Sequence, residues 1–171
     1  MKQEFTSKRT SINSKKVPAL FTAAEKLNAF AGKRTVFDYG CGAYDTAKEF
    51  VEGKGCLYMG YDKYNRPDSA NLASLMVALV NNIDIVTCSN VLNVVAEPEI
   101  MENIISDCAD IVSENGVVYF TVYEGNKSGI PSYSKERDSF QANKKTTDYI
   151  PILEKYFTYV EKHGKLLICR N

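Results

Sequence analysis

Apolar residues recur along the chain in two ways, as short unbroken runs and at helical spacing. The short runs predict buried strands at residues 35–38, 57–61, 83–88 and 117–122. The helical spacings predict helices at residues 18–31, 45–52, 72–80 and 98–114. Because strands alternate with helices, we expect a doubly wound α/β fold with a mainly parallel sheet.

The last part of the chain has a different pattern. Tyr149, Leu153 and Phe157 share one helical face. Residues 157–161 and 166–169 then predict two strands joined by a junction short enough for a hairpin. We therefore expect an antiparallel C-terminal hairpin at the edge of the sheet, with His163 in its turn.

The length of 171 residues suits one domain and is too short for two ordinary ones. We expect residues 1–171 to form a single domain with two irregular segments. Residues 1–16 are polar and basic, which predicts an N-terminal arm and not a secretory signal. Residues 124–145 show no sustained periodicity, and so long a connection favours a functional insertion on the substrate side. No stretch is apolar for long enough to predict a membrane span.

Five cysteines and a single histidine limit the chemistry of the chain. The cysteines are widely spaced and form no C-x-x-C pair. We therefore expect reduced, mostly buried thiols in a cytoplasmic protein. With His163 as the one histidine, we expect no metal site.

The formal net charge is zero, but the charges are unevenly spread. Basic side chains outnumber acidic ones by eight to two in residues 1–34 and by five to two in residues 127–145. Residues 36–126 hold four basic and fourteen acidic side chains. One interpretation is an ordinary solvated surface. The other is that the two basic segments form one cover over the ligand site and attract an anionic substrate.

Two alternate glycines, Gly40 and Gly42, follow Asp38 at the end of the first predicted strand. Such a turn lets a ligand approach the backbone closely. A dinucleotide-binding turn has a third glycine, but Asp45 stands there and places a negative charge where a pyrophosphate would lie. Asp62 ends the second strand, where a carboxylate can accept from both hydroxyls of a ribose. The pattern favours an adenosine with a cationic tail as the ligand.

At this point the sequence resembles the class I S-adenosylmethionine-dependent methyltransferases. The resemblance rests on residues 36–42, 60–62 and 84–92. It extends from residue 35 to the C-terminal hairpin. It implies a Rossmann-like fold, S-adenosylmethionine as the cofactor and methyl transfer as the activity.

The resemblance also implies roles for single residues. Gly40 and Gly42 would lie under the methionine part of the cofactor, and Asp38 would orient its amino group. Asp62 would hold the ribose hydroxyls, and Tyr64 would lie near the adenine or the ribose.

Further cofactor contacts are implied at two other places. Ser89 and Asn90 would border the sulfonium at the fourth strand of the family. Thr10, Ser11 and Asn13 would close over the carboxylate.

The chain departs from the family between its second and fourth strands. The family normally has a helix, a third strand and another helix there, and residues 62–83 are too few for the full set. The acid that usually contacts the adenine after the third strand has no clear counterpart, and Asp68 is the nearest candidate.

The acceptor is less defined than the cofactor. Residues 89–92 lack both prolines of the [DNS]-P-P-[YFW] motif, which disfavours methylation of an exocyclic amine of DNA. The chain has no Pro-Cys pair, which disfavours cytosine-C5 chemistry. A likeness to small methyltransferase-domain proteins of phages and mobile elements rests on residues 89–95, Gln141, Asn143, Lys144 and Tyr149. That likeness favours an anionic acceptor, either nucleic acid or a nucleotide.

The segment after Val122 leaves the carboxyl end of a central strand, so we expect it to shape the acceptor site. Tyr123 and Glu124 are the candidate bases for an acceptor that must lose a proton. The alternative is that both are loop anchors. Two other functions stay open, an enzyme that breaks the cofactor down without methylating and a binding module that needs a partner protein.

Overall fold

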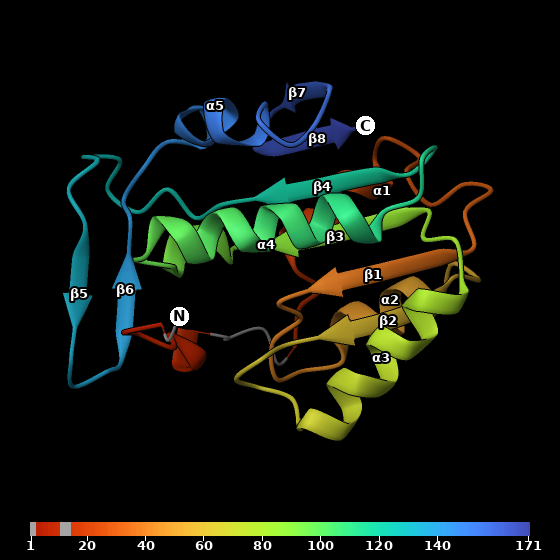
Figure 1. The fold of residues 1–171 in the computed structure, drawn as a ribbon, viewed down its shortest axis with the longest axis horizontal. Coiled ribbons are helices and arrows are strands. Elements are labelled where there is room, and N and C mark those ends of the chain that lie inside the picture. Colours follow the sequence, from red (N-terminus) through yellow and green to blue (C-terminus); the bar gives the residue numbers. More distant parts are fainter. Residues whose placement is uncertain (1–2, 11–14) are drawn as a thin grey trace.

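The computed structural model describes residues 3–10 and 15–171. Six strands form one sheet in the order β2-β1-β3-β4-β8-β7 (Figure 1). They are β1 (Thr35–Tyr39), β2 (Leu57–Tyr61), β3 (Ile85–Ser89), β4 (Val117–Thr121), β7 (Tyr159–His163) and β8 (Leu166–Arg170). The first four pair in parallel, and β8 joins β4 antiparallel. The predicted mainly parallel α/β sheet with an antiparallel C-terminal hairpin is confirmed.

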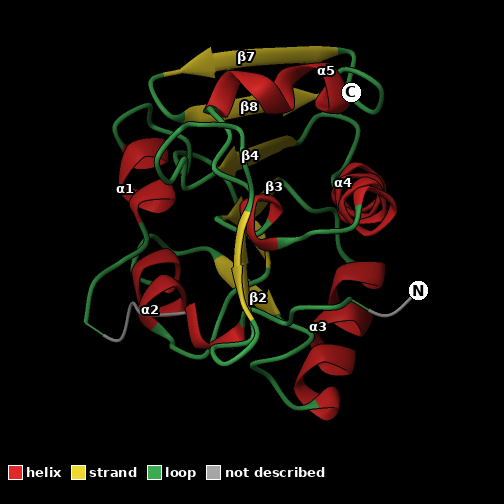
Figure 2. Ribbon diagram, turned by 90° about the vertical axis from the view of Figure 1, so that its left-hand side faces the viewer, coloured by secondary structure: helices red, strands yellow, loops and turns green. Residues whose placement is uncertain are grey.

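Helices cover both faces of this sheet. They are α1 (Ala19–Glu25), α2 (Thr46–Glu52), α3 (Asp68–Val80), α4 (Pro98–Ile111) and the short α5 (Ile150–Leu153). Helices α1 and α2 lie on one face, and α3 and α4 lie on the other (Figure 2). In the described part of the chain, no helix combines the length and the apolarity needed to cross a bilayer.

The core divides into two clusters because successive residues of a strand point to opposite faces. Val36 of β1 belongs to the cluster under α1 and α2, together with Leu20. Its neighbour Phe37 belongs to the cluster under α4, together with Ile105. Burial on both faces explains why the parallel strands read as unbroken apolar runs.

The first helix is shorter than its periodicity predicts. Leu20, Phe21 and Ala24 are buried as expected, but α1 ends at Glu25. Asn28 adopts a left-handed conformation with φ of 55°, and the N–H of Ala29 donates to the carbonyl of Ala24. This is the geometry that ends a helix, and asparagine tolerates it.

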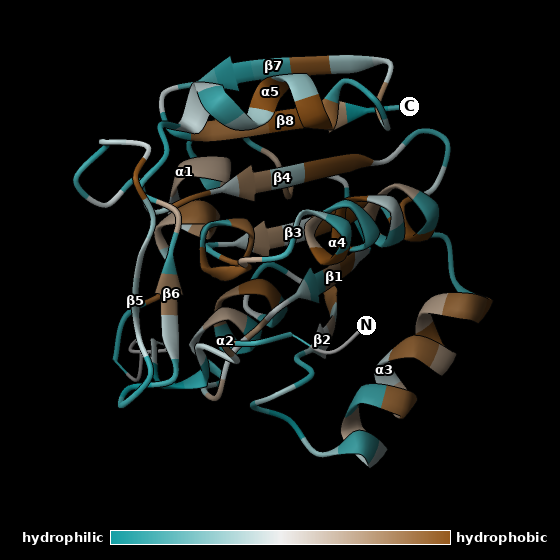
Figure 3. Cartoon of the chain, turned by 60° about the vertical axis from the view of Figure 1, so that its left-hand side comes forward, coloured by the Kyte–Doolittle hydropathy of each residue, from teal (hydrophilic) through white to brown (hydrophobic). Residues whose placement is uncertain are grey.

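Helix α3 stands where the family has a helix, a strand and a further helix. It begins four residues before the predicted start at Leu72, directly after Pro67. Asn71, in the added turn, is buried and exchanges two hydrogen bonds of 2.9 Å with the backbone of Asp62. Residues 62–84 hold α3 and no strand, so the prediction that the segment is too short for the full family set is confirmed. Figure 3 shows apolar stretches along α3 at this edge of the molecule.

Residues 124–145 contain a small hairpin that the sequence pattern did not predict. Strands β5 (Ser132–Ser134) and β6 (Ser139–Gln141) pair antiparallel as a separate sheet. They lie beyond the carboxyl ends of β1 to β4, beside the N-terminal segment (Figure 1). Strands of three residues with mostly polar side chains leave no apolar alternation to detect.

The C-terminal hairpin is confirmed with a shifted boundary. His163 is the last residue of β7 and pairs with Leu166, so it does not lie in the turn as predicted. Gly164, with φ of 60°, supplies the left-handed residue of the shorter turn.

Candidate active site

A cavity of about 1330 Å³ lies at the carboxyl ends of the parallel strands. Its floor is made by the loops that follow β1, β2, β3 and β4, which is where open α/β sheets bind ligands. The N-terminal segment and the β5–β6 hairpin complete its wall. Elements far apart in the sequence therefore meet around one space.

The glycine turn after β1 is held tightly against its neighbours. Gly40 and Gly42 have φ of 78° and 73°, a region that favours glycine. The amides of Gly40 and Cys41 donate to the carbonyl of Tyr61 at 2.7 and 3.0 Å. A β-carbon on Gly40 would lie 2.3 Å from Cγ2 of Val91. The turn needs glycine for both its conformation and its packing.

Asp62 ties the turn after β2 to the glycine turn. Its Oδ2 accepts from the amide of Gly42 at 2.9 Å. Its Oδ1 accepts from the amides of Tyr64 and Asn65 at 2.9 and 2.8 Å, and from the side chain of Asn65 at 3.2 Å. A carboxylate has about four lone-pair sites, so the position left for a ligand is on Oδ2.

Asp38 is a buried carboxylate in the wall of the cavity. Its oxygens accept from the hydroxyls of Tyr58 at 2.7 Å and Thr87 at 2.8 Å. Burial raises the pKa of Asp38 to about 6, although both hydrogen bonds act to lower it. A cation placed against Asp38 would restore the charged form.

Asp45 does not act as the sequence argument supposed. Its carboxylate forms an ion pair of 2.8 Å with Arg66, which also donates to the carbonyls of Gly42 and Tyr44. Neither Asp45 nor Arg66 lines the cavity. The negative charge that a ligand meets at this end therefore comes from Asp38 and Asp62.

Three other predicted cofactor residues line the same cavity, Tyr64, Ser89 and Asn90. The hydroxyl of Tyr64 donates to Oε1 of Gln3 at 3.1 Å. The amide of Asn90 donates to the carbonyl of Thr121 at 2.8 Å, with Asn90 at φ of 58°. These three residues therefore line the same cavity as Asp38, Gly40, Gly42 and Asp62.

The two candidate bases are separated by the structure. Tyr123 lines the cavity and is 64% exposed. Glu124 does not line it, because its Oε1 accepts from the amide and hydroxyl of Thr146 at 2.8 and 3.0 Å. These hydrogen bonds, with a contact to Lys127, lower the pKa of Glu124 to about 2. Its position fits the alternative, a loop anchor.

A polar cluster joins the loop after β3 to the β5–β6 hairpin. The side chain of Asn93 donates to Gln141 at 3.0 Å and accepts from the amide of Tyr123 at 3.2 Å. Gln141 donates to the carbonyl of Tyr123 at 2.8 Å. Asn93 is buried, and sequence reasoning noted it only within a run of similar residues. Asn143, Lys144 and Tyr149 do not line the cavity.

The N-terminal segment packs against the hairpin. Thr6 donates to the carboxylate of Asp138 through its amide and its hydroxyl, and the amide of Ser7 donates to the carbonyl of Asp138 at 2.9 Å. The ring of Phe5 lies 5.7 Å from that of Tyr133 and 6.4 Å from that of Phe140. Residues 3–7, β5 and β6 therefore form one cover over the cavity.

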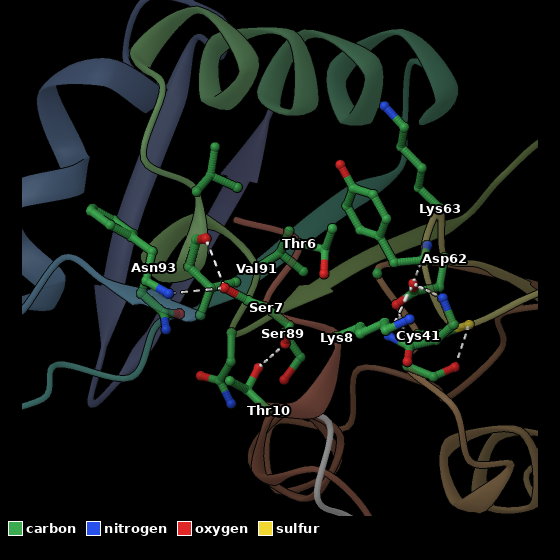
Figure 4. A pocket seen from close by; sticks show the side chains of 18 of the residues that line it. Thr6, Ser7, Lys8, Thr10, Cys41, Asp62, Lys63, Ser89, Val91 and Asn93 are labelled. Carbon is green, nitrogen blue, oxygen red and sulfur yellow. Dashed lines mark hydrogen bonds between the residues drawn. The ribbon is translucent and has the colours of Figure 1, made fainter. Parts of the chain in front are cut away.

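Figure 4 shows where this cover lies in the cavity. Ser7 stands between Asn93 on one side and Asp62 on the other. Thr10 also lines the cavity, whereas Ser11 and Asn13, predicted to close over the cofactor carboxylate, lie outside the described residues. The basic side chains of the lining are Lys8, Lys63 and Arg137.

Thiol and metal chemistry have little support in the described residues. No group of three or more His, Cys, Asp or Glu side chains there is placed to hold a metal ion. Cys41, the one cysteine in the cavity wall among them, has its pKa raised to about 12, chiefly by burial. It is a neutral thiol at physiological pH.

No protein-family profile and no curated protein matches the sequence. Solved structures do match the fold. A 1,6-didemethyltoxoflavin-N1-methyltransferase from Burkholderia thailandensis, with S-adenosylhomocysteine bound, has a TM-score of 0.63 at 16% identity, over 90% of this chain and 78% of its own. The sugar N-methyltransferase KedS8 from Streptoalloteichus has a TM-score of 0.65 at 12% identity. The match covers 100% of this chain and 94% of KedS8.

A third similar structure is the magnesium protoporphyrin IX methyltransferase from Synechocystis, with S-adenosylmethionine bound. Its TM-score is 0.55 at 17% identity, over 97% of this chain and 80% of its own. These structural neighbours are class I S-adenosylmethionine-dependent methyltransferases. At such identities the likeness shows a shared fold only, and the activity has to be inferred from the residues of the site.

Proposed function

We propose that this chain binds S-adenosylmethionine and transfers its methyl group to an acceptor molecule. The observation behind the proposal is that Asp38, Asp62 and the Gly40–Gly42 turn meet at one end of one cavity. The fold supports it, because two neighbouring structures hold the cofactor or its demethylated product.

The residues present fit such a cofactor. The buried Asp38 offers a carboxylate to the amino group, and the glycine turn leaves backbone free of side chains for the methionine part. Oδ2 of Asp62 has room for one ribose hydroxyl. A second hydroxyl would require the side-chain amide of Asn65 to turn away from Oδ1. When bound, the cofactor would supply an electrophilic methyl group on a sulfonium, near Ser89 and Asn90.

On the acceptor side, Tyr123 is the predicted residue that stays a candidate for contact with the acceptor. Lys8 and Arg137 of the lining support an anionic acceptor, either a nucleotide or nucleic acid, as does the likeness to phage and mobile-element proteins. We place the protein in the cytoplasm, since its five cysteines are free thiols.

Calorimetry and product analysis test the proposal. We expect heat on titration with S-adenosylmethionine or S-adenosylhomocysteine and none with NAD. Labelled cofactor, incubated with the protein and a crude lysate, should yield S-adenosylhomocysteine and a labelled acceptor. Methylthioadenosine or a lactone as product would indicate breakdown of the cofactor, and heat with NAD alone would overturn the assignment.

A further inference from the structure

We infer that the acceptor is a planar aromatic anion of mononucleotide size, bound beneath the cover formed by residues 3–7, β5 and β6, and not a polymer. This inference rests on the proposed function and narrows its acceptor to one class. It depends on four features of the cavity: its size, its aromatic wall, its charge and the contacts of its cover.

The cavity is larger than one ligand requires. Sites for a single small molecule usually have about 300–1,000 Å³, and this cavity has about 1330 Å³. The residues fitted to the cofactor occupy the end formed by the loops after β1 and β2. The other end is lined by Tyr123, Ser132, Tyr133, Phe140 and Gln141. A second small ligand has its own wall there.

That second wall presents aromatic rings to the cavity. Tyr123 is 64% exposed and Tyr133 is 67% exposed, and both line the cavity. The ring of Tyr133 is supported from behind by Phe5, at 5.7 Å. Exposed rings with fixed backbones offer faces on which a flat ligand can stack.

Basic side chains also line the cavity, Arg137 on the β5–β6 hairpin and Lys8 near Cys41 and Asp62 (Figure 4). Lys8 and Arg137 line the cavity, and neither forms an ion pair among residues 3–10 and 15–171. The neighbouring carboxylate of Asp138 is engaged by Thr6, which holds its pKa below the usual range. An anionic group on the ligand can therefore pair with Lys8 or Arg137.

The cover spans part of the space beside this wall. It is joined to the loop after β3, where Ser7 donates to the carbonyl of Val94 at 3.4 Å, and to β6, where the amide of Phe140 donates to Ser7 at 3.2 Å. A nucleotide within a strand continues through a phosphate on each side, so a polymer must cross these contacts. A free nucleotide ends within the cavity and leaves them intact.

The chemistry at this wall also restricts the acceptor. Glu136 is the one carboxylate among the described residues of the second wall and the cover that line the cavity, and it is exposed on the hairpin. An acceptor atom that is nucleophilic without first losing a proton, as an imine-type ring nitrogen is, suits a wall with so few carboxylates. Its lone pair forms the bond to the methyl carbon while the carbon–sulfur bond breaks, and sulfur keeps that electron pair as a thioether.

A fluorescent pair of probes tests the inference. The small probe is 2-aminopurine riboside 5′-monophosphate, whose emission falls when its base stacks. The large probe is a single-stranded DNA ten nucleotides long, on the order of one single-strand binding site, with 2-aminopurine at its centre. Both are titrated against protein saturated with S-adenosylhomocysteine, whose binding is first established by calorimetry.

We expect the monophosphate to bind with quenching and the oligonucleotide to bind far more weakly. Tyr133→Leu should weaken binding of the monophosphate about 5-fold or more, the low end of the loss for a stacked base. Tyr159→Leu is the matched control, because Tyr159 is also 65% exposed but lies on β7, outside the cavity. Equal melting temperatures of the two variants establish that both fold.

Three results would overturn the inference. Tighter or equal binding of the oligonucleotide would identify a polymer as the acceptor. No quenching of the monophosphate, with the cofactor product bound, would exclude a planar aromatic anion while leaving the proposed function intact. No binding of S-adenosylhomocysteine would instead remove the proposed function, and this inference with it.

Discussion

The two ends of the cavity are built in opposite ways. At the cofactor end, Asp38 and Asp62 are 2% and 8% exposed, and their oxygens already accept hydrogen bonds from the protein. At the acceptor end, Tyr123 and Tyr133 are 64% and 67% exposed, and the wall comes from segments far apart in sequence. The cofactor end is therefore fixed before a ligand arrives, whereas the acceptor end keeps side chains that a ligand can still order.

The largest effect should follow from Gly40→Ala, which changes the glycine turn at the cofactor end. The added carbon meets Val91 at 2.3 Å, and the left-handed conformation adds strain. Together these should cost about 2–5 kcal/mol in the free energy of unfolding and abolish cofactor binding. Chemical denaturation and calorimetry measure the two losses.

Gly55→Ala is the matched control for that change. Gly55 has the same φ of 78°, but nothing lies within 4 Å of the added carbon. Its free energy of unfolding should fall only by the contribution of strain, about 1–2 kcal/mol, and its cofactor affinity should not change. An equal loss in both variants would show that contact with Val91 plays no part.

Asp62→Ala should have the next largest effect. Removing hydrogen bonds to a charged group should weaken S-adenosylmethionine binding by about 1–3 kcal/mol. Asp68, the candidate for the adenine contact, is exposed at the start of α3 and does not line the cavity, so Asp68→Ala serves as control and should bind normally. If both variants bind like the parent chain, Asp62 does not hold the ribose.

A change of pH should test Asp38 without altering the fold around it. With its pKa at about 6, Asp38 is neutral below that pH and charged above it. A cationic amino group binds the charged form, so affinity should rise about 10-fold between pH 5 and pH 7, as one proton is released. Calorimetry in buffers of different ionisation heat measures that proton. Asp38→Asn should bind weakly and show no such rise; a persistent rise would assign the titration to another group.

The smallest effect is expected from Glu124→Gln, outside the cavity. The variant should melt at a slightly lower temperature, because Thr146 loses a charged acceptor, and should keep its cofactor affinity. The pKa of Glu124 is lowered to about 2 in the folded chain, so the difference should be present above pH 4.5 and vanish as the pH falls towards 2. A large loss of turnover at neutral pH, with normal folding, would show that Glu124 takes part in the reaction.

At the proposed cofactor end, the sequence predicted where the residues lie, for a local reason. Asp38, Gly40 and Asp62 lie in or next to strands whose apolar runs are unmistakable, so their position at a strand end could be deduced. The partners of Asp38, Tyr58 and Thr87, could not, since both lie inside strands where nothing marks a side chain as a donor.

At the other end the deciding contacts are long-range. Thr6 and Asp138 are separated by 132 positions, and no local pattern predicts that they meet. The charge distribution gave the one usable signal, because it suggested that two basic segments lie over the same ligand site. It did not distinguish Glu124, which anchors its loop, from its neighbour Tyr123, which lines the cavity.

The position of residues 3–7 over the cavity has a consequence for the rate of turnover. A ligand beneath residues 3–7 lies behind Ser7, which is hydrogen-bonded to Val94 on one side and to Asp138 on the other. We therefore expect each reaction cycle to include a movement of this segment, and departure of the products to be a slow step. We expect a rapid first turnover followed by a slower steady rate, set by how often the segment lifts and not by the speed of methyl transfer.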